Sequence, residues 1–180
     1  MKRNLLLNLL EHYSPSSSEE VFKCDMIAFA QKHENCFERS LEIGHFTASA
    51  WLVNNDNSKA LLMHHTKLNR WFQLGGHCDG DADVLAVAIK EAQEESGIEH
   101  IQAMSASIFD IDIHLIPANK KEKEHYHYDV RFLLQVTGDD TIIQNRESKE
   151  LRWIGKDKSD LPTDNFSVIR MFNKWLDNKL

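Results

Sequence analysis

Three glutamates lie within five residues of one another in the segment KEAQEESG, residues 90–97: Glu91, Glu94 and Glu95. Clustered carboxylates repel one another unless a positive charge lies among them. Carboxylate oxygens suit hard cations such as Mg²⁺ and Mn²⁺, and these cations also bind substrate phosphates. The segment therefore predicts either a divalent-metal site or a solvated acidic surface, in which Lys90 pairs with Glu94 one helical turn away.

The periodicity around these glutamates predicts a helix from about Ala82 to Ser96, with Gly97 as its C-cap. The glutamates are expected in one arc, pointing away from the core, because residues three and four apart are neighbours on a helix. Before the helix, GGHCDGDAD offers Gly75 and Gly76, whose bare backbone can present a carbonyl to a metal or an amide to a phosphate. The opposite side of the helix is apolar and is expected to face the core, through Leu85, Ala88, Ile89 and Ala92.

With its flanking strands included, the segment resembles the Nudix (MutT-like) hydrolases, whose signature is G-x5-E-x7-R-E-U-x-E-E-x-G-U, with U a bulky apolar residue. Aligned on Gly97, the signature runs from residue 76 to residue 98. The resemblance covers about residues 44–154, extends loosely over the first 40, and is to a bacterial subgroup with an N-terminal helical segment. The matching signature positions are Gly76, Glu91, Glu94, Glu95, Gly97 and Ile98.

Three positions depart from the signature. Ala82 replaces its first glutamate, Lys90 replaces its arginine, and Ala92 is smaller than the usual aliphatic residue. In the family, the first two residues help to brace the loop and the helix against each other. Asp81 or Asp83 could pair with Lys90 instead, although lysine lacks the bidentate fork of arginine.

The resemblance implies an α+β fold of the Nudix type, an α/β/α sandwich with a mixed β-sheet between helices. Residues 1–180 are expected to form a single Nudix hydrolase domain, with 1–40 as an N-terminal helical extension and 41–180 as the Nudix core. Periodicity predicts a first helix at Asn4–Tyr13, a second that ends near Lys32, and a terminal one at Asp164–Leu180 with Asp164 as N-cap.

Ser16 to Ser18 are the expected N-caps of the second helix, and Glu19 and Glu20 are favourable in its first turn. Residues 68–83 are expected to form a Gly-rich loop before the glutamate helix. Strands are predicted at 45–55, 59–65, 108–117, 126–136 and 150–155, the first two of them as a hairpin.

The resemblance also implies an activity: a divalent-metal-dependent pyrophosphohydrolase that cleaves a nucleoside diphosphate linked to another moiety. That substrate is a nucleotide sugar, an ADP-ribose-like molecule or a nucleoside triphosphate. The cofactor, Mg²⁺ or Mn²⁺, would bind Glu91, Glu95 and the carbonyl of Gly76, and Glu94 would be a third ligand or would orient the attacking water.

Some members take their general base from a glutamate outside the signature. Glu150 is the candidate here, beside Glu147, which is more simply explained as an exposed loop carboxylate. Substrate phosphates would meet Arg70 and Lys67, which can equally be ordinary surface cations, and the backbone of Gly75 and Gly76.

The aromatic residues and histidines give weaker signals. Trp71 and Phe72 are expected to divide between pocket and core, because successive strand residues face opposite sides of a sheet. For the same reason Tyr126 and Tyr128 share one face and His125 and His127 the other, and most such residues are structural. The two histidines can bind one ion, but they have no Cys or His partner at a recognisable zinc spacing, so a zinc site is not expected.

Composition limits the remaining classes. A formal charge of −7 argues against stable nucleic-acid binding, which normally needs a basic face. Three cysteines without a C-x-x-C motif favour reduced thiols and a cytoplasmic location, and no apolar run approaches a membrane span. The expected partner is a small nucleotide-derived substrate, with a homodimer left open. Two alternatives stay open: a catalytically weak Nudix domain that binds a nucleotide as a sensor or scaffold, and a non-catalytic α/β protein with an acidic helix.

Overall fold

The computed structural model describes residues 3–119, 122–146 and 148–177. The described residues form four α-helices, a short 3-10 helix and the eight strands of one sheet. The helices are α1 Asn4–His12, α2 Glu20–Lys32, α3 Val84–Ser96, α4 Phe166–Asp177 and η1 Lys158–Asp160. The strands are β1 Gly44–Val53, β2 Ala60–His65, β3 Trp71–Phe72, β4 Leu74–His77, β5 Ile101–Ala103, β6 Asp110–Ile116, β7 His125–Val136 and β8 Ser148–Ile154.

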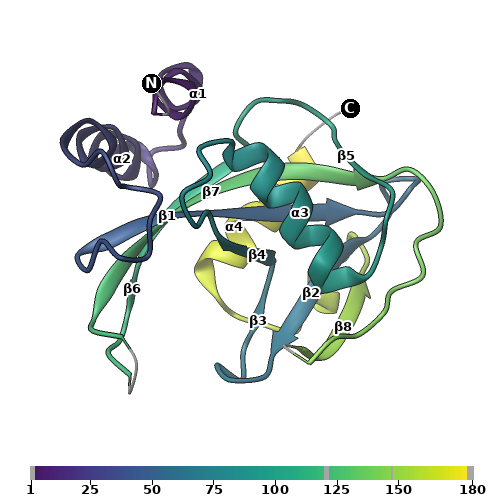
Figure 1. Cartoon of the computed structure of the whole chain (residues 1–180). Helices are drawn as coiled ribbons and strands as arrows, with labels where there is room; N and C mark the ends of the chain where they lie inside the picture. The colour runs from purple at the N-terminus through teal and green to yellow at the C-terminus, as the bar shows by residue number, and fades with distance from the viewer. Residues whose placement is uncertain (1–2, 120–121, 147, 178–180) are drawn as a thin grey trace.

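The sheet is built around two long strands. β1 and β7 run parallel over ten paired residues, from Gly44 beside Tyr126 to Val53 beside Gln135. All other pairings are antiparallel: β2 and β4 add to β1, β5 and β6 add to β7, and β3 and β8 add to β2. This is a mixed, curled sheet with its strands branching from the central pair (Figure 1).

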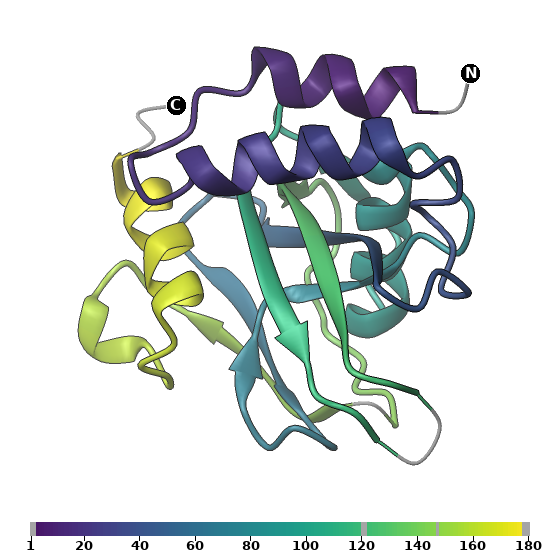
Figure 2. The ribbon, with the colours of Figure 1, turned by 90° about the vertical axis from the view of Figure 1, so that its left-hand side faces the viewer.

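Helices cover both faces of the sheet, as an α/β/α sandwich requires. Figure 2 shows α3 and α4 on opposite sides of the strands, with α1 and α2 lying across one end. The larger apolar cluster joins α1, α2 and α3 to one face of the sheet, and the smaller one joins α4 to the other through Trp51, Phe172 and Trp175. The expected α+β architecture, a mixed sheet between helices, is confirmed, and the N-terminal helices are part of its packing.

Several local expectations are wrong, for identifiable reasons. The loop expected at 68–83 contains β3 and β4, because residues 74–77 pair with Thr47–Ala50 of β1 although two glycines interrupt any strand pattern. The terminal helix starts after Asn165, whose side-chain oxygen accepts the amides of Ser167 and Val168, so Asp164 is not its cap. The expected helical residues 178–180 lie outside the described residues.

The serines expected to cap α2 have another role. Glu19 is the residue next to the helix, and it accepts hydrogen bonds from both the amide and the hydroxyl of Ser16. Its carboxylate is fully buried and also bonds Tyr13 of the preceding segment and Lys174 of α4, the latter at 2.7 Å. A buried charge therefore joins the first helices of the chain to the last one.

This carboxylate predicts a pH dependence of stability. Burial alone would raise the pKa of Glu19, but hydrogen bonds from Lys174, Ser16 and Tyr13 lower it from 4.5 to about 2. Because the pKa is lower in the folded state, the ionised group stabilises the fold above about pH 4.5, and that contribution is lost as the pH falls towards 2. We expect the free energy of unfolding, measured with urea across this range, to depend less on pH in Glu19→Gln.

Glu34→Gln is the matched control, because the side chain of Glu34 is 92% exposed in its ion pair with Arg3. It should keep the wild-type pH profile. A Glu19→Gln profile that parallels the wild type would contradict the assignment.

Among the described residues, we find no helix whose length and apolar character would carry it across a bilayer.

Candidate active site

The three glutamates of α3 do not share one exposed arc, as the helical pattern predicted. Glu95 is only 6% exposed, the Glu91 side chain is 18% exposed, and that of Glu94 is 59% exposed. The expected apolar stripe is also shifted, since Leu85 and Ile89 are only partly buried. The face of α3 turned to the protein consists of Val84, Val87, Ala88, Ala92, Glu95 and Ser96.

The carboxylates of Glu91 and Glu95 lie against β4. The amide of Gly75 donates to Oε2 of Glu95 at 2.8 Å, so the backbone of the strand holds this side chain directly. The Glu91 carboxylate occupies the position that a side chain at residue 76 would need, and Gly76 leaves that space free. The contact between α3 and β4 therefore depends on two adjacent glycines.

These groups fit a hard divalent cation. Mg²⁺ and Mn²⁺ are bound by carboxylate and backbone carbonyl oxygens. Glu91 and Glu95 of α3 and the backbone of Gly76 in β4 supply oxygens of both kinds where the helix contacts the strand. Glu94, on the exposed flank, is available to solvent.

Lys90 pairs with its helix neighbours and not with the loop. Its ammonium lies 3.8 Å from Glu91 and 3.6 Å from Glu94, which confirms the expected Lys90–Glu94 pair. The expectation that Asp81 or Asp83 pairs with it is wrong. Asp83 instead accepts the amide of Ala86 as the N-cap of α3, and Asp81 accepts the amide of Asp83.

Other contacts brace the loop before α3, where the signature's first glutamate is replaced by Ala82. Arg39 makes a bidentate ion pair with Asp79, with Nη2 at 2.6 Å from Oδ2. The amide of Gly80 donates to the carbonyl of Phe37 at 2.9 Å. Residues 37–39, just before β1, thus brace the loop before α3, where the signature would use its first glutamate and its arginine.

Residues 44–176 match the NUDIX domain family. The chain belongs to this family. The sequence is 29% identical over 109 residues to the rat (Rattus norvegicus) bis(5'-nucleosyl)-tetraphosphatase [asymmetrical]. The aligned segment covers 59% of this chain and 71% of the rat protein. The expected family and the expected enzyme, a Nudix hydrolase, are confirmed.

Solved structures agree on the NUDIX fold. An Ap4A hydrolase from C. elegans, crystallised as a binary complex, superposes with a TM-score of 0.58 at 17% identity, covering 73% of this chain and 95% of that one. A MutT protein from Methanosarcina mazei Go1 gives a TM-score of 0.57 at 18% identity, over 78% of this chain and 99% of that one. At such identities the likeness concerns the fold.

The remaining predicted residues of the NUDIX domain come from elements other than α3 and β4. Glu150, on β8, is half-exposed and accepts two hydrogen bonds from Arg152, at 2.7 and 2.9 Å. Lys67 and Arg70 are exposed in the turn between β2 and β3. Glu147 lies outside the described residues.

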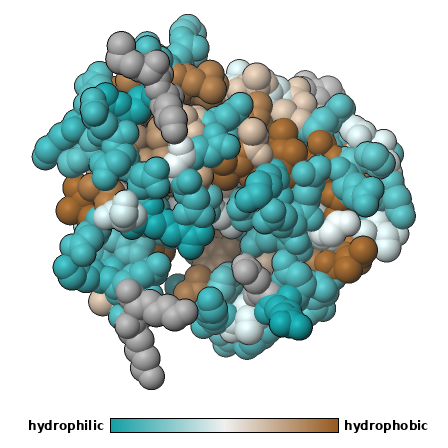
Figure 3. All heavy atoms as spheres, in the orientation of Figure 1, coloured by the Kyte–Doolittle hydropathy of each residue, from teal (hydrophilic) through white to brown (hydrophobic). Residues whose placement is uncertain are grey.

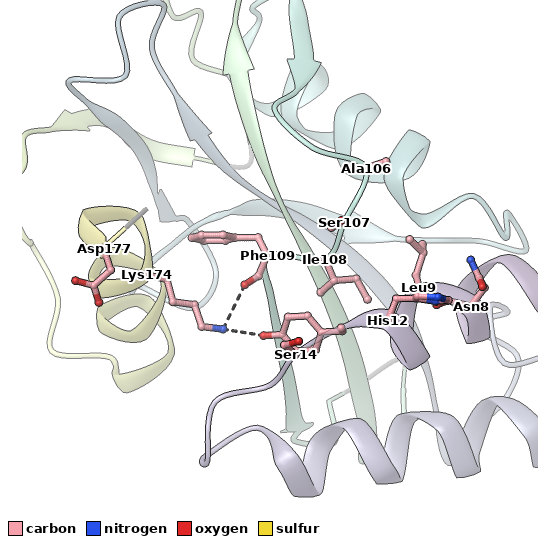
Figure 4. Close-up of a pocket in the computed structure, with 11 residues that line it drawn as sticks. Asn8, Leu9, His12, Ser14, Ala106, Ser107, Ile108, Phe109, Lys174 and Asp177 are labelled. Atoms are coloured by element: carbon pink, nitrogen blue, oxygen red, sulfur yellow. Dashed lines mark hydrogen bonds between the residues drawn. The ribbon is translucent and has the colours of Figure 1, made fainter. Parts of the chain in front are cut away.

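The surface of the described chain has several hollows, and one of them is lined by a predicted site residue. Arg70 and Trp71 line a pocket completed by residues 161–165, and Trp71 stacks on His64 and lies under the Arg152 guanidinium. Figure 3 shows the face of Figure 1 hollowed near its centre, where β4 runs. A pocket of about 790 Å³ lies between α1, the segment 106–109 and α4, and none of the predicted site residues lines it (Figure 4).

Sequence reasoning missed a group of histidines beside β4. Ring nitrogens of His45, His77 and His127 all lie within 4.8 Å of one another, and the Nε2 atoms of His125 and His127 are 3.2 Å apart. Burial is the main reason that the pKa falls to about 4 for His77 and to about 2 for His127. No spacing rule finds the group, because its members come from three strands that only the sheet register brings together.

Substitution of Gly76, the glycine beside Glu91, is expected to affect catalysis without unfolding the protein. In Gly76→Ala, the new Cβ would displace the Glu91 carboxylate, which is the end of a flexible side chain, so the fold should survive. Misplacing a catalytic group by about 1 Å can cost about a hundredfold in rate, and we expect a loss of kcat of that order. Steady-state kinetics with Mg²⁺ tests this, beside a thermal melt.

Gly138→Ala is the control, because its Cβ would also meet only a side chain, that of the exposed His100. It should keep wild-type kcat. If Gly76→Ala also keeps the wild-type kcat, catalysis does not require the Glu91 carboxylate to lie beside residue 76.

Proposed function

We propose that this protein is a divalent-metal-dependent pyrophosphohydrolase that cleaves a nucleoside diphosphate linked to another moiety. One observation carries the proposal: Glu91 and Glu95, in register with the Nudix signature, are held against the glycines of β4. Membership of the NUDIX domain family and the relation to the rat tetraphosphatase support the same reaction class.

In this proposal the chain's own groups position the reaction. Glu91, Glu95 and the Gly76 carbonyl would hold Mg²⁺ or Mn²⁺; when bound, such an ion offsets the charge of the diphosphate and helps to activate water. The Gly75 amide fixes the orientation of Glu95. Glu94, exposed and 3.6 Å from Lys90, is free to turn towards a water or to act as a third ligand.

Glu150 is proposed as the general base. It must first leave Arg152, which binds it through two hydrogen bonds. Arg70 and Lys67, with the backbone of Gly75 and Gly76, are proposed to contact substrate phosphates. The pocket that Arg70 shares with Trp71 supports this placement, because an aromatic ring beside a cation suits a nucleotide.

Turnover against a panel of substrates tests the function. The panel holds nucleotide sugars, ADP-ribose, nucleoside triphosphates and a bis(5'-nucleosyl)-tetraphosphate, the class that the name of the rat relative specifies. Each is incubated with Mg²⁺, with Mn²⁺ and with a chelator, and the products are separated by chromatography. We expect metal-dependent release of a nucleotide from at least one class; no release from any would overturn the proposal.

A sensor that binds a nucleotide without turning it over is the second candidate. Ala82 and Lys90 favour it, since the signature's glutamate and arginine are missing and Lys90 lies among the glutamates. Nucleotide binding by calorimetry, combined with no turnover in the panel, would select this candidate.

The setting of the activity is also a proposal. We propose a single domain of residues 1–180, with 1–40 as its N-terminal extension, because α1 and α2 share the larger apolar cluster with the sheet. Cys24, Cys36 and Cys78 are free thiols, which supports a reducing, cytoplasmic setting. The proposed partner is the small nucleotide substrate, without stable nucleic-acid or membrane binding; gel filtration would decide whether the chain forms a homodimer.

A further inference from the structure

We propose that His45, His77, His125 and His127 form a transition-metal site, selective for Zn²⁺, that is separate from the carboxylate site on α3. The proposal is independent of the hydrolase function. It rests on where the sheet places these four rings and on the hydrogen bonds that their nitrogens make.

The sheet register brings the rings together. His45 of β1 pairs directly with His127 of β7, and His77, the last residue of β4, pairs with Thr47 two residues further along β1. Paired and alternate residues of neighbouring strands face the same side, so all these side chains converge on one face. Ring centroids of His45 lie 5.0 Å from those of His125 and His127 and 5.1 Å from that of His77.

The distances suit a tetrahedral ion. Zn–N bonds of about 2.0–2.1 Å place neighbouring nitrogens about 3.3–3.4 Å apart. Nε2 of His125 and Nε2 of His127 are already 3.2 Å apart. Nitrogens of His45, His77 and His127 lie within 4.8 Å of one another, so small ring rotations would complete the set.

The hydrogen bonds leave nitrogens for a metal. Nδ1 of His125 bonds the carbonyl of Lys123 at 2.7 Å, which requires the proton on Nδ1 and leaves the Nε2 lone pair free. His45 is only 3% exposed, and neither of its ring nitrogens makes a hydrogen bond with the described residues. The nearby carbonyl of Leu41 favours a protonated nitrogen on His45 without reaching hydrogen-bond geometry, and a metal would bind the other one.

A histidine cluster that binds no metal explains fewer of these contacts than a metal site does. A hydrogen bond between His125 and His127 would satisfy that pair, but at least one ring nitrogen of the buried His45 would stay without a partner among the described residues, which native proteins rarely tolerate. Four imidazoles and no carboxylate favour zinc over Mg²⁺ or Mn²⁺. Because His77 directly follows Gly76, a bound ion would also fix the end of β4 against β1 and β7.

Zinc titration of the full-length protein, prepared without a histidine tag, tests the site. Zn²⁺ is added in competition with a chromophoric chelator, and Co²⁺ replaces it to report tetrahedral geometry by visible absorption. We expect one tight equivalent per chain, a tetrahedral Co²⁺ spectrum, and a loss of affinity of at least about a hundredfold in His127→Gln and His77→Gln. The exposed His100→Gln should bind as the wild type does.

The outcomes separate the two sites. Glu95→Gln should keep the tight zinc equivalent, because Glu95 is not a ligand of the histidine set. No tight binding by the wild type, full affinity in both histidine variants, or loss of the equivalent in Glu95→Gln would each overturn the proposal. Metal-free circular dichroism and melting identify a variant that fails to fold, and the wild-type stoichiometry and Co²⁺ spectrum decide the question without it.

Discussion

Glu95→Gln is expected to lower kcat/KM for the metal-dependent reaction about a thousandfold. The amide oxygen of glutamine can still accept the hydrogen bond from Gly75, so the side chain should stay in place while its charge is lost. A metal ion contributes several kcal/mol of charge stabilisation, and about 4 kcal/mol corresponds to a thousandfold in rate. Initial rates across a Mg²⁺ titration measure the effect and any rise in the metal concentration needed for half-maximal rate.

Glu99→Gln is the isosteric control, since Glu99 is exposed just beyond the end of α3. It should keep the wild-type rate and metal dependence. Full turnover by Glu95→Gln would remove this glutamate from the active site, and with it the main support for the metal-dependent reaction.

Arg131→Met is expected to destabilise the fold by about 3–5 kcal/mol. Arg131 is 2% exposed and forms ion pairs with Asp110 at 3.0 Å, Asp112 at 3.3 Å and Asp129 at 2.7 Å. Removing one partner of a buried ion pair leaves uncompensated charge, and here it leaves three acidic side chains that share the remaining cations. For a domain of this size we expect a fall in melting temperature of about 10 °C.

The surface pair Arg152–Glu150 supplies the control. Both of its side chains are close to half-exposed, so Arg152→Met should cost less than about 1 kcal/mol. Chemical denaturation of both variants tests the contrast. An Arg131→Met protein as stable as Arg152→Met would mean that the acidic side chains around Arg131 are not held as ions.

Much of the fold and the core of the site could be predicted from the sequence. The Gly-rich segment, the helix and its C-cap at Gly97 are local signals, and Gly97 has the left-handed backbone expected of it. The register of the signature places Glu91 and Glu95 four residues apart, and both turn towards β4. Local periodicity and a family motif were sufficient here because each concerns residues close together in the chain.

The errors have a common physical origin in contacts between distant residues. Glu95 is buried because an amide of β4 satisfies it, and a helical pattern alone assigns a charged residue to solvent. β4 itself exists because β1 lies beside it, and the bracing of the loop comes from Arg39, forty residues before Asp79. The four histidines converge through the order of strands, which sequence spacing cannot express.

The contact between Glu19 and Lys174 has a consequence for how the chain is made. Glu19 and Lys174 are 155 positions apart, so the carboxylate just before α2 lacks this cationic partner until α4 has been synthesised. Pairings between such distant residues slow folding, because a long loop must close before the contact can form. α1 and α2 should therefore dock last although they leave the ribosome before the strands and α4, and until then their apolar faces are a natural substrate for chaperones.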